Sequence, residues 1–242
     1  MLGNLTRGSG PGPGRHALYN RPVTGDERAG WHDPEQVNEY LVRVGTLEPR
    51  LGGEAMLADV LPATPERVLD LGCGDGRLAT LVLERCETVI EVVAVDRSPP
   101  MLTRARERFA GDGRVEVREW DMNHPITGFG SFDVIVSGFA IHHLDDVRKQ
   151  GLYGEVAAQL RPGGVFANLE VVRSATPELH ATFRSAIGRE HDDPDDQLVD
   201  VEAQLGWMRT AGLHQVDCLW RWRGFALLVG EAARWGHQSV GR

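Results

Sequence analysis

The sequence predicts an α/β fold with a doubly wound, mostly parallel sheet, and two observations support this prediction. Short apolar runs rich in β-branched residues have the length of buried strands, and they lie near residues 67–71, 91–95, 114–118, 132–137 and 164–171. Amphipathic segments with helical periodicity lie near residues 76–86, 99–109, 146–160 and 199–211. Because the two kinds of segment alternate, we expect a parallel sheet covered by helices on both faces.

The end of the chain departs from this alternation. Two strand-like runs, at residues 215–223 and 224–230, follow one another directly. Antiparallel strands can be joined by a tight turn, whereas parallel strands need a long crossover, so these runs predict a hairpin. We therefore expect a seven-stranded sheet whose last strand is antiparallel.

The chain divides into three parts. Residues 1–30 are rich in glycine, proline and arginine, and they predict a disordered tail or a lid that folds on substrate. Residues 31–66 show helical periodicity twice, which predicts two helices; the apolar positions are Val37, Tyr40, Leu41 and Val44, then Leu57, Val60 and Leu61. Residues 67–242 form the main domain of the prediction.

Composition excludes several classes of protein. With 242 residues, 41% of them hydrophobic and 25% charged, the chain suits a globular domain with a proper core. The net charge of −9 argues against a nucleic acid as main partner, because that binding draws on Lys and Arg contacts to phosphate. No apolar stretch reaches the roughly 18 residues of a membrane span. The expected partners are a small-molecule substrate and a second copy of the chain in a homodimer.

Cysteine usage indicates a reducing compartment. Cys73, Cys86 and Cys218 have no zinc-like spacing, and an odd number argues against a disulfide framework. We therefore expect a cytoplasmic enzyme with free thiols.

A glycine-rich turn follows the first strand. Asp70-Leu71-Gly72-Cys73-Gly74-Asp75-Gly76 places glycine at alternate positions, where the backbone takes positive φ or lies against a ligand. Such turns sit at the carboxyl ends of strands, where ligands bind in open α/β sheets. Arg77 stands where a dinucleotide fingerprint needs its third glycine, and Gly76-Arg77-Leu78 lacks the Lys and hydroxyl of a Walker A loop. The turn predicts a different nucleotide-like ligand.

Two later strands also end in acids. Asp96 lies 20 residues past Gly76, where a carboxylate can accept hydrogen bonds from both hydroxyls of a ribose. The alternative is that Asp96 only caps the next helix, which has prolines in its first turn. Asp121 and Met122 end the third strand, and on their own they are equally typical of a turn acid beside a core methionine.

Five motifs in order across residues 68–166 resemble those of the class I S-adenosylmethionine-dependent methyltransferases. They are D-L-G-C-G-D-G, Asp96, Asp121-Met122, the run from Phe132 to Leu144, and L-R-P-G-G-V-F at 160–166. The resemblance implies a Rossmann-like fold and S-adenosyl-L-methionine as cofactor, with Asp121 facing the adenine, Met122 covering its ring and Ser137 near the methionine end. It also implies that the two helices at residues 31–66 cover the cofactor site. The cofactor-binding residues it implies are Asp70, Gly72, Cys73, Gly74, Asp96, Arg97, Met101, Asp121, Met122 and Ser137.

The expected reaction is methyl transfer to an O, N or C atom of a small acceptor. Such an in-line displacement needs the reactants held together in a dry pocket, and a general base only where the acceptor arrives protonated. His142 and His143 are candidates for that base, or they cap and pack the next helix. Glu170 can bind an acceptor amine or form a strand-end salt bridge, and Tyr40 is a further candidate for handling the acceptor.

The acidic segment at residues 189–196 is the one candidate for a cation site. Its spacing is not that of an EF-hand, so a solvated loop with Asp195 or Asp196 capping the following helix is favoured, and we expect no metal. Aromatic and basic side chains outside the motifs can line an acceptor pocket or serve as packing: Trp31, His32, Trp220, Trp222 and Arg223.

Two alternatives remain at this stage. One is an enzyme that uses the same cofactor without transferring methyl, either cyclising it or resembling carboxy-S-adenosylmethionine synthase. The other is a non-catalytic module that only binds the cofactor. The sulfur-containing product distinguishes them, because methyl transfer yields S-adenosylhomocysteine, cyclisation yields methylthioadenosine, and a binding module yields neither.

Overall fold

The computed structural model describes residues 31–45 and 47–234. The predicted tail at residues 1–30 lies outside the described residues.

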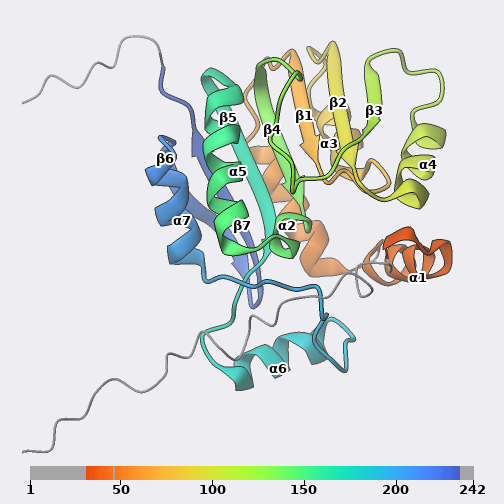
Figure 1. Cartoon of the computed structure of the whole chain (residues 1–242), viewed down its shortest axis with the longest axis vertical. Helices are drawn as coiled ribbons and strands as arrows, with labels where there is room; N and C mark the ends of the chain where they lie inside the picture. Colours follow the sequence, from red (N-terminus) through yellow and green to blue (C-terminus); the bar gives the residue numbers. More distant parts are fainter. Residues whose placement is uncertain (1–30, 46, 235–242) are drawn as a thin grey trace, which may run out of the picture.

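A seven-stranded sheet forms the centre of the described chain, in the order β3-β2-β1-β4-β5-β7-β6 (Figure 1). The strands are β1 (Arg67–Leu71), β2 (Glu91–Asp96), β3 (Val115–Glu119), β4 (Phe132–Gly138), β5 (Leu160–Val171), β6 (His214–Trp222) and β7 (Phe225–Glu231). Strands β1 to β5 pair in parallel, and β7 is antiparallel to both of its neighbours. The predicted doubly wound sheet with an antiparallel last strand is therefore confirmed.

Helices cover both faces of this sheet. They are α1 (Pro34–Gly45), α2 (Glu48–Asp59), α3 (Arg77–Arg85), α4 (Pro99–Arg108), α5 (Asp146–Gln159), α6 (Pro177–Ala186) and α7 (Val201–Thr210), with a 3₁₀ turn η3 (Ile141–His143) after β4. Figure 1 shows α5 and α7 in front of the sheet, α2 and α3 behind it, and α1 and α6 near the carboxyl ends of the parallel strands. Helix α6 was not expected from the sequence, although Thr176 caps it and Pro177 begins it.

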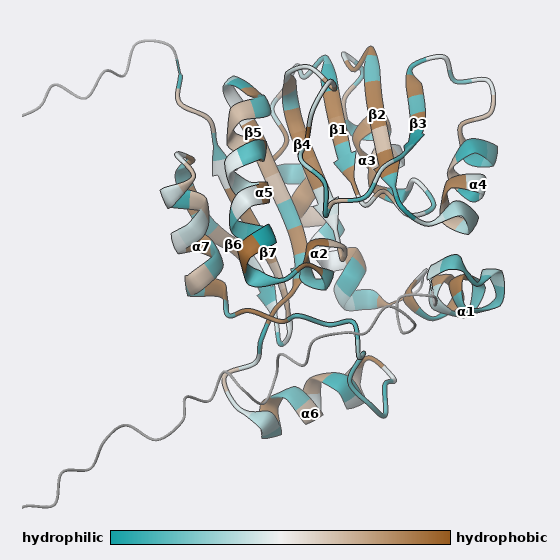
Figure 2. Ribbon diagram, viewed as in Figure 1, coloured by the Kyte–Doolittle hydropathy of each residue, from teal (hydrophilic) through white to brown (hydrophobic). Residues whose placement is uncertain are grey.

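The core is split by the alternation of side chains along each strand. Leu69 and Leu71 of β1 pack with residues of α5 and α7, whereas Val68 packs with residues of α2 and α3. The central strands are largely hydrophobic in Figure 2, and the edge strand β3 is half-exposed. This burial on both faces explains why the central strands appear in the sequence as continuous apolar runs.

The glycine turn between β1 and α3 requires its glycines for steric reasons. Gly76 has φ +85°, and a Cβ there would lie 2.4 Å from Phe109 Cε2. Gly72 has φ +68°, and a Cβ there would lie 2.3 Å from the Cβ of Ala140. Larger residues at these two positions would force the turn away from its neighbours.

We predict that Gly76→Ala lowers the free energy of unfolding by about 1–3 kcal/mol, because it adds backbone strain and a steric clash with Phe109. Urea unfolding followed by circular dichroism measures this. Gly154→Ala in helix α5 is the matched control, since a Cβ there meets nothing within 4 Å. Equal stability of the two variants would contradict the steric role of Gly76.

Candidate active site

A cavity lies at the carboxyl ends of β1, β2 and β4, above the glycine turn. The residues predicted from the sequence that line it are Tyr40, Asp70, Gly72, Cys73, Gly74, Asp96, Arg97, Met101, Asp121, Met122 and His143. The fold thus brings the glycine turn and the acids of three strand ends to one place, as the parallel arrangement requires.

Asp70 is the most perturbed acid of this cavity. Its side chain is fully buried, Oδ2 accepts a hydrogen bond from Ala79 N at 3.0 Å, and Oδ1 has no partner among the described residues. Burial raises the pKa of Asp70 to about 7. A buried oxygen without a donor favours a ligand that carries a hydrogen-bond donor or a positive charge.

Asp96 holds the glycine turn and lines the cavity at the same time. Its Oδ2 accepts from Gly74 N at 2.9 Å and its Oδ1 accepts from Ser98 N at 2.8 Å. Burial raises the pKa of Asp96, while these two backbone donors act to lower it. Helix α4 is capped by Ser98, so the alternative in which Asp96 is the cap is wrong.

Asp121 and Met122 line the cavity from the segment that follows β3. Asp121 Oδ1 accepts from both the backbone and the side-chain amide of Asn123, each at 2.8 Å. Met122 reaches over the glycine turn, since its Cε would lie 3.3 Å from a Cβ placed on Gly72. Both residues also line the cavity, so they form a polar and an apolar patch side by side.

Ser137 is the one predicted cofactor residue that does not line this cavity. It is fully buried in β4, and its hydroxyl donates to the carbonyl of Leu71 at 2.8 Å. Because Ser137 pairs with Leu71 in the sheet, its hydroxyl fastens β4 to β1 instead of facing the methionine end of a cofactor.

A second cavity adjoins the first. Both are lined by Trp31, Tyr40, Arg50, Phe139 and His143, so these residues form a junction between two chambers. Burial raises the pKa of Tyr40, which keeps its hydroxyl neutral. We call the first chamber the cofactor cavity and the second the acceptor cavity.

Phe139, one of the junction residues, has a strained backbone conformation. Its φ is +54°, in the left-handed region that a large side chain rarely adopts. Its backbone N–H donates to Leu169 O at 2.7 Å, its ring lies 4.9 Å from that of Phe225, and the Arg50 guanidinium stacks on it at 5.2 Å. Strain kept by packing is typical of functional sites.

The two neighbouring histidines of η3 have opposite electrostatic environments. His142 Nδ1 lies 2.5 Å from Glu170 Oε1, and its Nε2 lies 3.3 Å from Asp196 Oδ1. Burial alone would lower the pKa of His142, but the two carboxylates raise it to about 10. Burial and the adjacent charge of His142 lower the pKa of His143 well below its usual range. Neither imidazole has the pKa near neutrality that suits a general base.

Glu170 does not reach the acceptor. It is fully buried behind His142 and lines neither chamber, and its Oε1 also accepts from Val171 N at 2.7 Å. The prediction that it faces the pocket is therefore wrong, and the alternative of a strand-end salt bridge describes it better.

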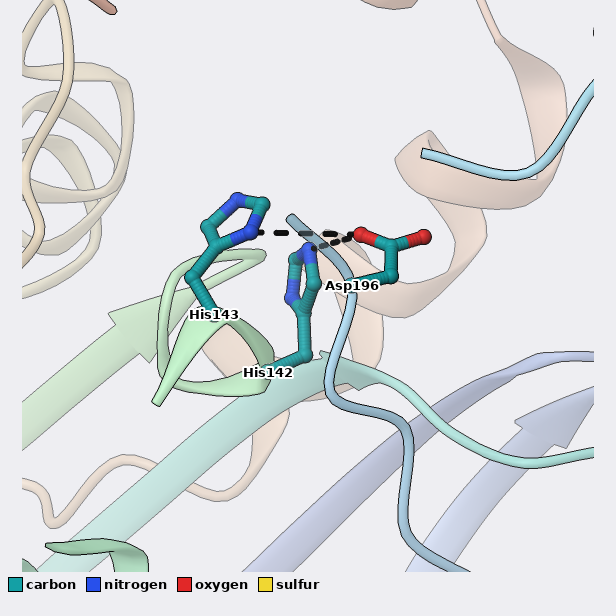
Figure 3. A group of neighbouring side chains, drawn as sticks. All are labelled: His142, His143 and Asp196. Atoms are coloured by element: carbon teal, nitrogen blue, oxygen red, sulfur yellow. Dashed lines mark ion pairs between the residues drawn. The ribbon is translucent and has the colours of Figure 1, made fainter. Parts of the chain in front are cut away.

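The acidic loop has a different role from the one expected. Asp200, not Asp195 or Asp196, caps α7. The loop instead returns to η3, where Gln197 N donates to His142 O at 2.8 Å and Asp196 approaches both imidazoles (Figure 3). The histidines cap no helix either, because Asp145 caps α5.

The aromatic residues of the terminal hairpin serve as packing. Trp220 lies against α2, where it would contact a Cβ on Gly53 at 3.0 Å, and Trp222 packs near Phe183 and Phe225. Arg223 stacks on the ring of Trp222. They line neither chamber, whereas Trp31 lines both and His32 is exposed.

Residues that the sequence did not single out complete the site. Arg50 lines both chambers and Phe139 joins them. Arg50 lies on a helix of weak amphipathicity, so no local pattern in the sequence marks it. Ser137 and Gly138, small residues at the end of β4, are the signal for the sharp turn of the backbone at Phe139.

Comparison with known proteins identifies the domain. A family model described as a methyltransferase domain matches residues 68–164. An uncharacterised methyltransferase of Mycobacterium tuberculosis is 36% identical over 126 residues, which cover 52% of this chain and 59% of that protein. Trans-aconitate 2-methyltransferase of Rhodococcus jostii is 35% identical over 136 residues, which cover 56% of this chain and 49% of that protein. The match thus spans about half of these relatives' length.

Solved structures show the same fold. An O-methyltransferase family protein of Burkholderia thailandensis superposes with a TM-score of 0.65 at 22% identity, covering 83% of this chain and 60% of that one. Human N-acetylserotonin methyltransferase in complex with S-adenosylmethionine gives 0.66 at 15% identity, covering 88% and 60%. The fold is thus Rossmann-like. Residues 68–164 thus match a methyltransferase domain, in the part of the chain where the motifs resemble those of the class I S-adenosylmethionine-dependent methyltransferases.

Within the part of the chain that the structure describes, no helix is long and apolar enough to cross a membrane.

We predict that the stability of the protein depends on the ionisation of Asp70. The folded chain holds this proton up to about pH 7, whereas the unfolded carboxyl releases it near 3.8, so stability falls as pH rises between these values. Relative to Asp70→Asn, the wild type should lose unfolding free energy on the order of 4 kcal/mol between pH 4 and 8. Urea unfolding at several pH values measures the difference, and a constant difference would disprove it.

Proposed function

We propose that this protein transfers a methyl group from S-adenosylmethionine to a small-molecule acceptor. The observation that carries the proposal is the pair of joined chambers, one built largely from the methyltransferase motifs and the other from residues of α1, the turn after β4 and the acidic loop. The names of the curated relatives, all methyltransferases, support the same reaction.

The residues of the cofactor cavity suit S-adenosylmethionine. Asp96 uses one hydrogen bond on each oxygen for the backbone, and each carboxylate oxygen has a further lone pair for a ribose hydroxyl. The unpartnered Oδ1 of Asp70 suits the ammonium of the methionine arm. Met122 offers an apolar surface for the adenine beside the polar group of Asp121. When bound, the cofactor would supply an electrophilic methyl group.

The chain contributes orientation and exclusion of water to the transfer. A methyl group would pass between the two chambers at the five junction residues. Three of these residues, Trp31, Tyr40 and Phe139, have aromatic side chains. Trp31 meets the rings of Tyr40 and His143 edge-on at 5.0 and 5.7 Å, which closes this region around the reacting atoms. Proximity and a dry site can account for most of the rate enhancement.

The charge of the acceptor cavity favours an acceptor with an anionic group. Arg50 pairs with Glu54 and Arg189 pairs with Asp193, but Arg43 has no ion pair with any described residue. Burial and the nearby positive charge of Arg189 lower the pKa of Arg43. A negatively charged group of the acceptor beside Arg43 would offset both of these unfavourable effects. A carboxylate-bearing acceptor would meet this requirement.

The decisive experiment is to incubate the protein with S-adenosylmethionine and a panel of carboxylate-bearing and neutral acceptors, then identify both products by mass spectrometry. S-adenosylhomocysteine together with a methylated acceptor supports the proposal. Methylthioadenosine, or cofactor binding without turnover on any acceptor, would favour a cyclising enzyme or a binding module instead.

We predict that Asp96→Ala weakens the binding of S-adenosylhomocysteine by about 10- to 100-fold, because it removes a charged acceptor from the site. Isothermal titration calorimetry measures the affinity. Asp112→Ala, which changes a partly exposed acid outside the cavity, is the control. Unchanged affinity in Asp96→Ala would show that the assignment to the ribose is wrong.

We predict that Arg43→Gln raises the KM for an anionic acceptor about tenfold and leaves kcat within about twofold, because it removes binding common to the ground and transition states. Steady-state kinetics with the acceptor found in the panel measures both constants. Arg104→Gln on the exposed side of α4 serves as the control, and an equal KM in both variants would exclude the role of Arg43.

We propose further that the protein is a cytoplasmic homodimer. The three free thiols support a reducing compartment. Light scattering after gel filtration would establish the number of chains.

A further inference from the structure

We propose that His142, His143 and Asp196 form a binding site for one divalent first-row transition metal on the wall of the acceptor cavity. Each residue offers one ligand atom, and the three atoms lie within 4.8 Å of one another. All three residues line the acceptor cavity. The sequence predicted no metal, because the acidic loop alone has no recognisable spacing and its approach to the histidine pair is a tertiary contact.

The distances fit chelation of one ion. Asp196 Oδ1 lies 3.3 Å from His142 Nε2 and 3.9 Å from His143 Nδ1, and both contacts converge on this oxygen in Figure 3. Ligand atoms of a tetrahedral ion with bonds of about 2.0–2.2 Å are about 3.4 Å apart. The distance from Asp196 Oδ1 to His143 Nδ1 is about half an ångström longer than this, and the ligand atoms as a group lie within 4.8 Å, so the imidazole of His143 would need to move towards the other two ligands.

The two carboxylate oxygens of Asp196 face different neighbours. Its Oδ2 faces Arg189 Nη1 at 3.7 Å, whereas Oδ1 is buried, points between the two imidazoles and makes no hydrogen bond with a described residue. Oδ1 nevertheless forms ion pairs with the two imidazoles, at 3.3 Å from His142 Nε2 and 3.9 Å from His143 Nδ1. A buried carboxylate needs a neighbouring positive charge, which either a protonated His142 or a metal ion at this point would supply.

Glu170 supplies the outer shell that metal-binding histidines usually have. Its Oε1 lies 2.5 Å from His142 Nδ1, which holds the ring so that the opposite nitrogen, Nε2, faces Asp196 and the cavity. Metal-ligating histidines typically donate their second N–H to a carboxylate in this way. Glu170 lines neither chamber, and support of the metal-binding His142 would explain why its carboxylate is buried.

The donor set selects the class of ion. Two nitrogens and one carboxylate oxygen favour Zn²⁺ or Fe²⁺ over Mg²⁺ and Ca²⁺, which prefer oxygen ligands alone. His143 Nδ1 also lies 3.4 Å from the backbone oxygen of Asp195, a contact that the metal would replace or share. Three protein ligands leave a position open towards the cavity, as in catalytic rather than structural sites.

If the proposed methyl transfer is correct, the open position gives the site a function. An oxygen of the acceptor could bind the ion there, at the boundary of the chamber that contains Arg43 and beside the junction at His143. Metal binding, however, is testable without any acceptor or cofactor.

The test uses tag-free protein freed of metal by a chelator and titrated with Zn²⁺, Co²⁺ or Mg²⁺. We expect one Zn²⁺ per chain by calorimetry and by elemental analysis, visible d–d bands of bound Co²⁺, and no binding of Mg²⁺ at comparable concentration. His143→Ala and Asp196→Asn should weaken Zn²⁺ binding by at least about 100-fold, and Glu170→Gln by about 10- to 100-fold. His180→Ala is the control, because His180 pairs with one carboxylate, Asp192, at 2.9 Å.

Circular dichroism and urea unfolding, measured on the same samples, show whether each variant is folded. The proposal is overturned if wild-type protein binds no Zn²⁺, or if folded His143→Ala and Asp196→Asn bind it as tightly as the His180→Ala control. Loss of Zn²⁺ binding in folded variants, with S-adenosylhomocysteine binding retained in Asp196→Asn, which lies outside the cofactor cavity, supports it. Failure of methyl transfer in the acceptor panel would not affect either outcome, so the two proposals fail separately.

Discussion

The close contact between Gly72 and Ala140 is the constraint on which the site depends. These residues follow the adjacent strands β1 and β4, and the space for a Cβ on Gly72 is taken by the Cβ of Ala140. The glycine turn and the histidine turn are therefore packed against each other without a gap. Because one turn forms the cofactor cavity and the other borders the acceptor cavity, this single contact sets the distance between the two chambers.

A chain of polar contacts extends from this point through the second chamber. Glu170 of β5 pairs with His142, and His142 pairs with Asp196 of the acidic loop. Arg189, at the start of the same loop, also pairs with Asp196. Charges this deeply buried are stable only as a group, since removal of one partner leaves another uncompensated. The network thus ties the acidic loop to the sheet, and it does so whether a proton or a metal ion lies between His142 and Asp196.

The part of this arrangement that depends on local sequence was predictable. Glycines at positive φ, acids at strand ends and the alternation of apolar segments follow from short-range sterics and burial, so the sheet, the cofactor family and the lining of the first cavity could be inferred. Ser137 shows the limit, because alternation says that a side chain is buried but not that its hydroxyl bonds to Leu71.

The second chamber was predictable only in part. The sequence makes Trp31, Tyr40, His142 and His143 candidates for handling an acceptor, and all four line this chamber, but the contacts of its acidic wall could not be inferred. The sequence predicts that Asp196 caps a helix and that Glu170 faces the pocket, because local neighbours are all that a sequence pattern shows. Their functions come from contacts with His142, which lies in a different part of the chain. The same holds for Arg50, whose position between the chambers is set by the packing of α2 and by Glu54, and no periodicity in its own helix indicates it.

The position of Trp31 at the junction depends on the hydroxyl of Ser98, which makes two hydrogen bonds. Ser98 Oγ accepts from Met101 N at 3.3 Å, which fixes the start of α4 and with it Met101 in the cofactor cavity, and it donates to the carbonyl of Trp31 at 2.5 Å. Trp31 in turn packs on Tyr40 and His143. Formation of the cofactor cavity and closure of the junction are therefore linked through Ser98. Binding of the cofactor and exclusion of water from the transfer can thus depend on the same short segment, although the chambers they serve are built from different strands.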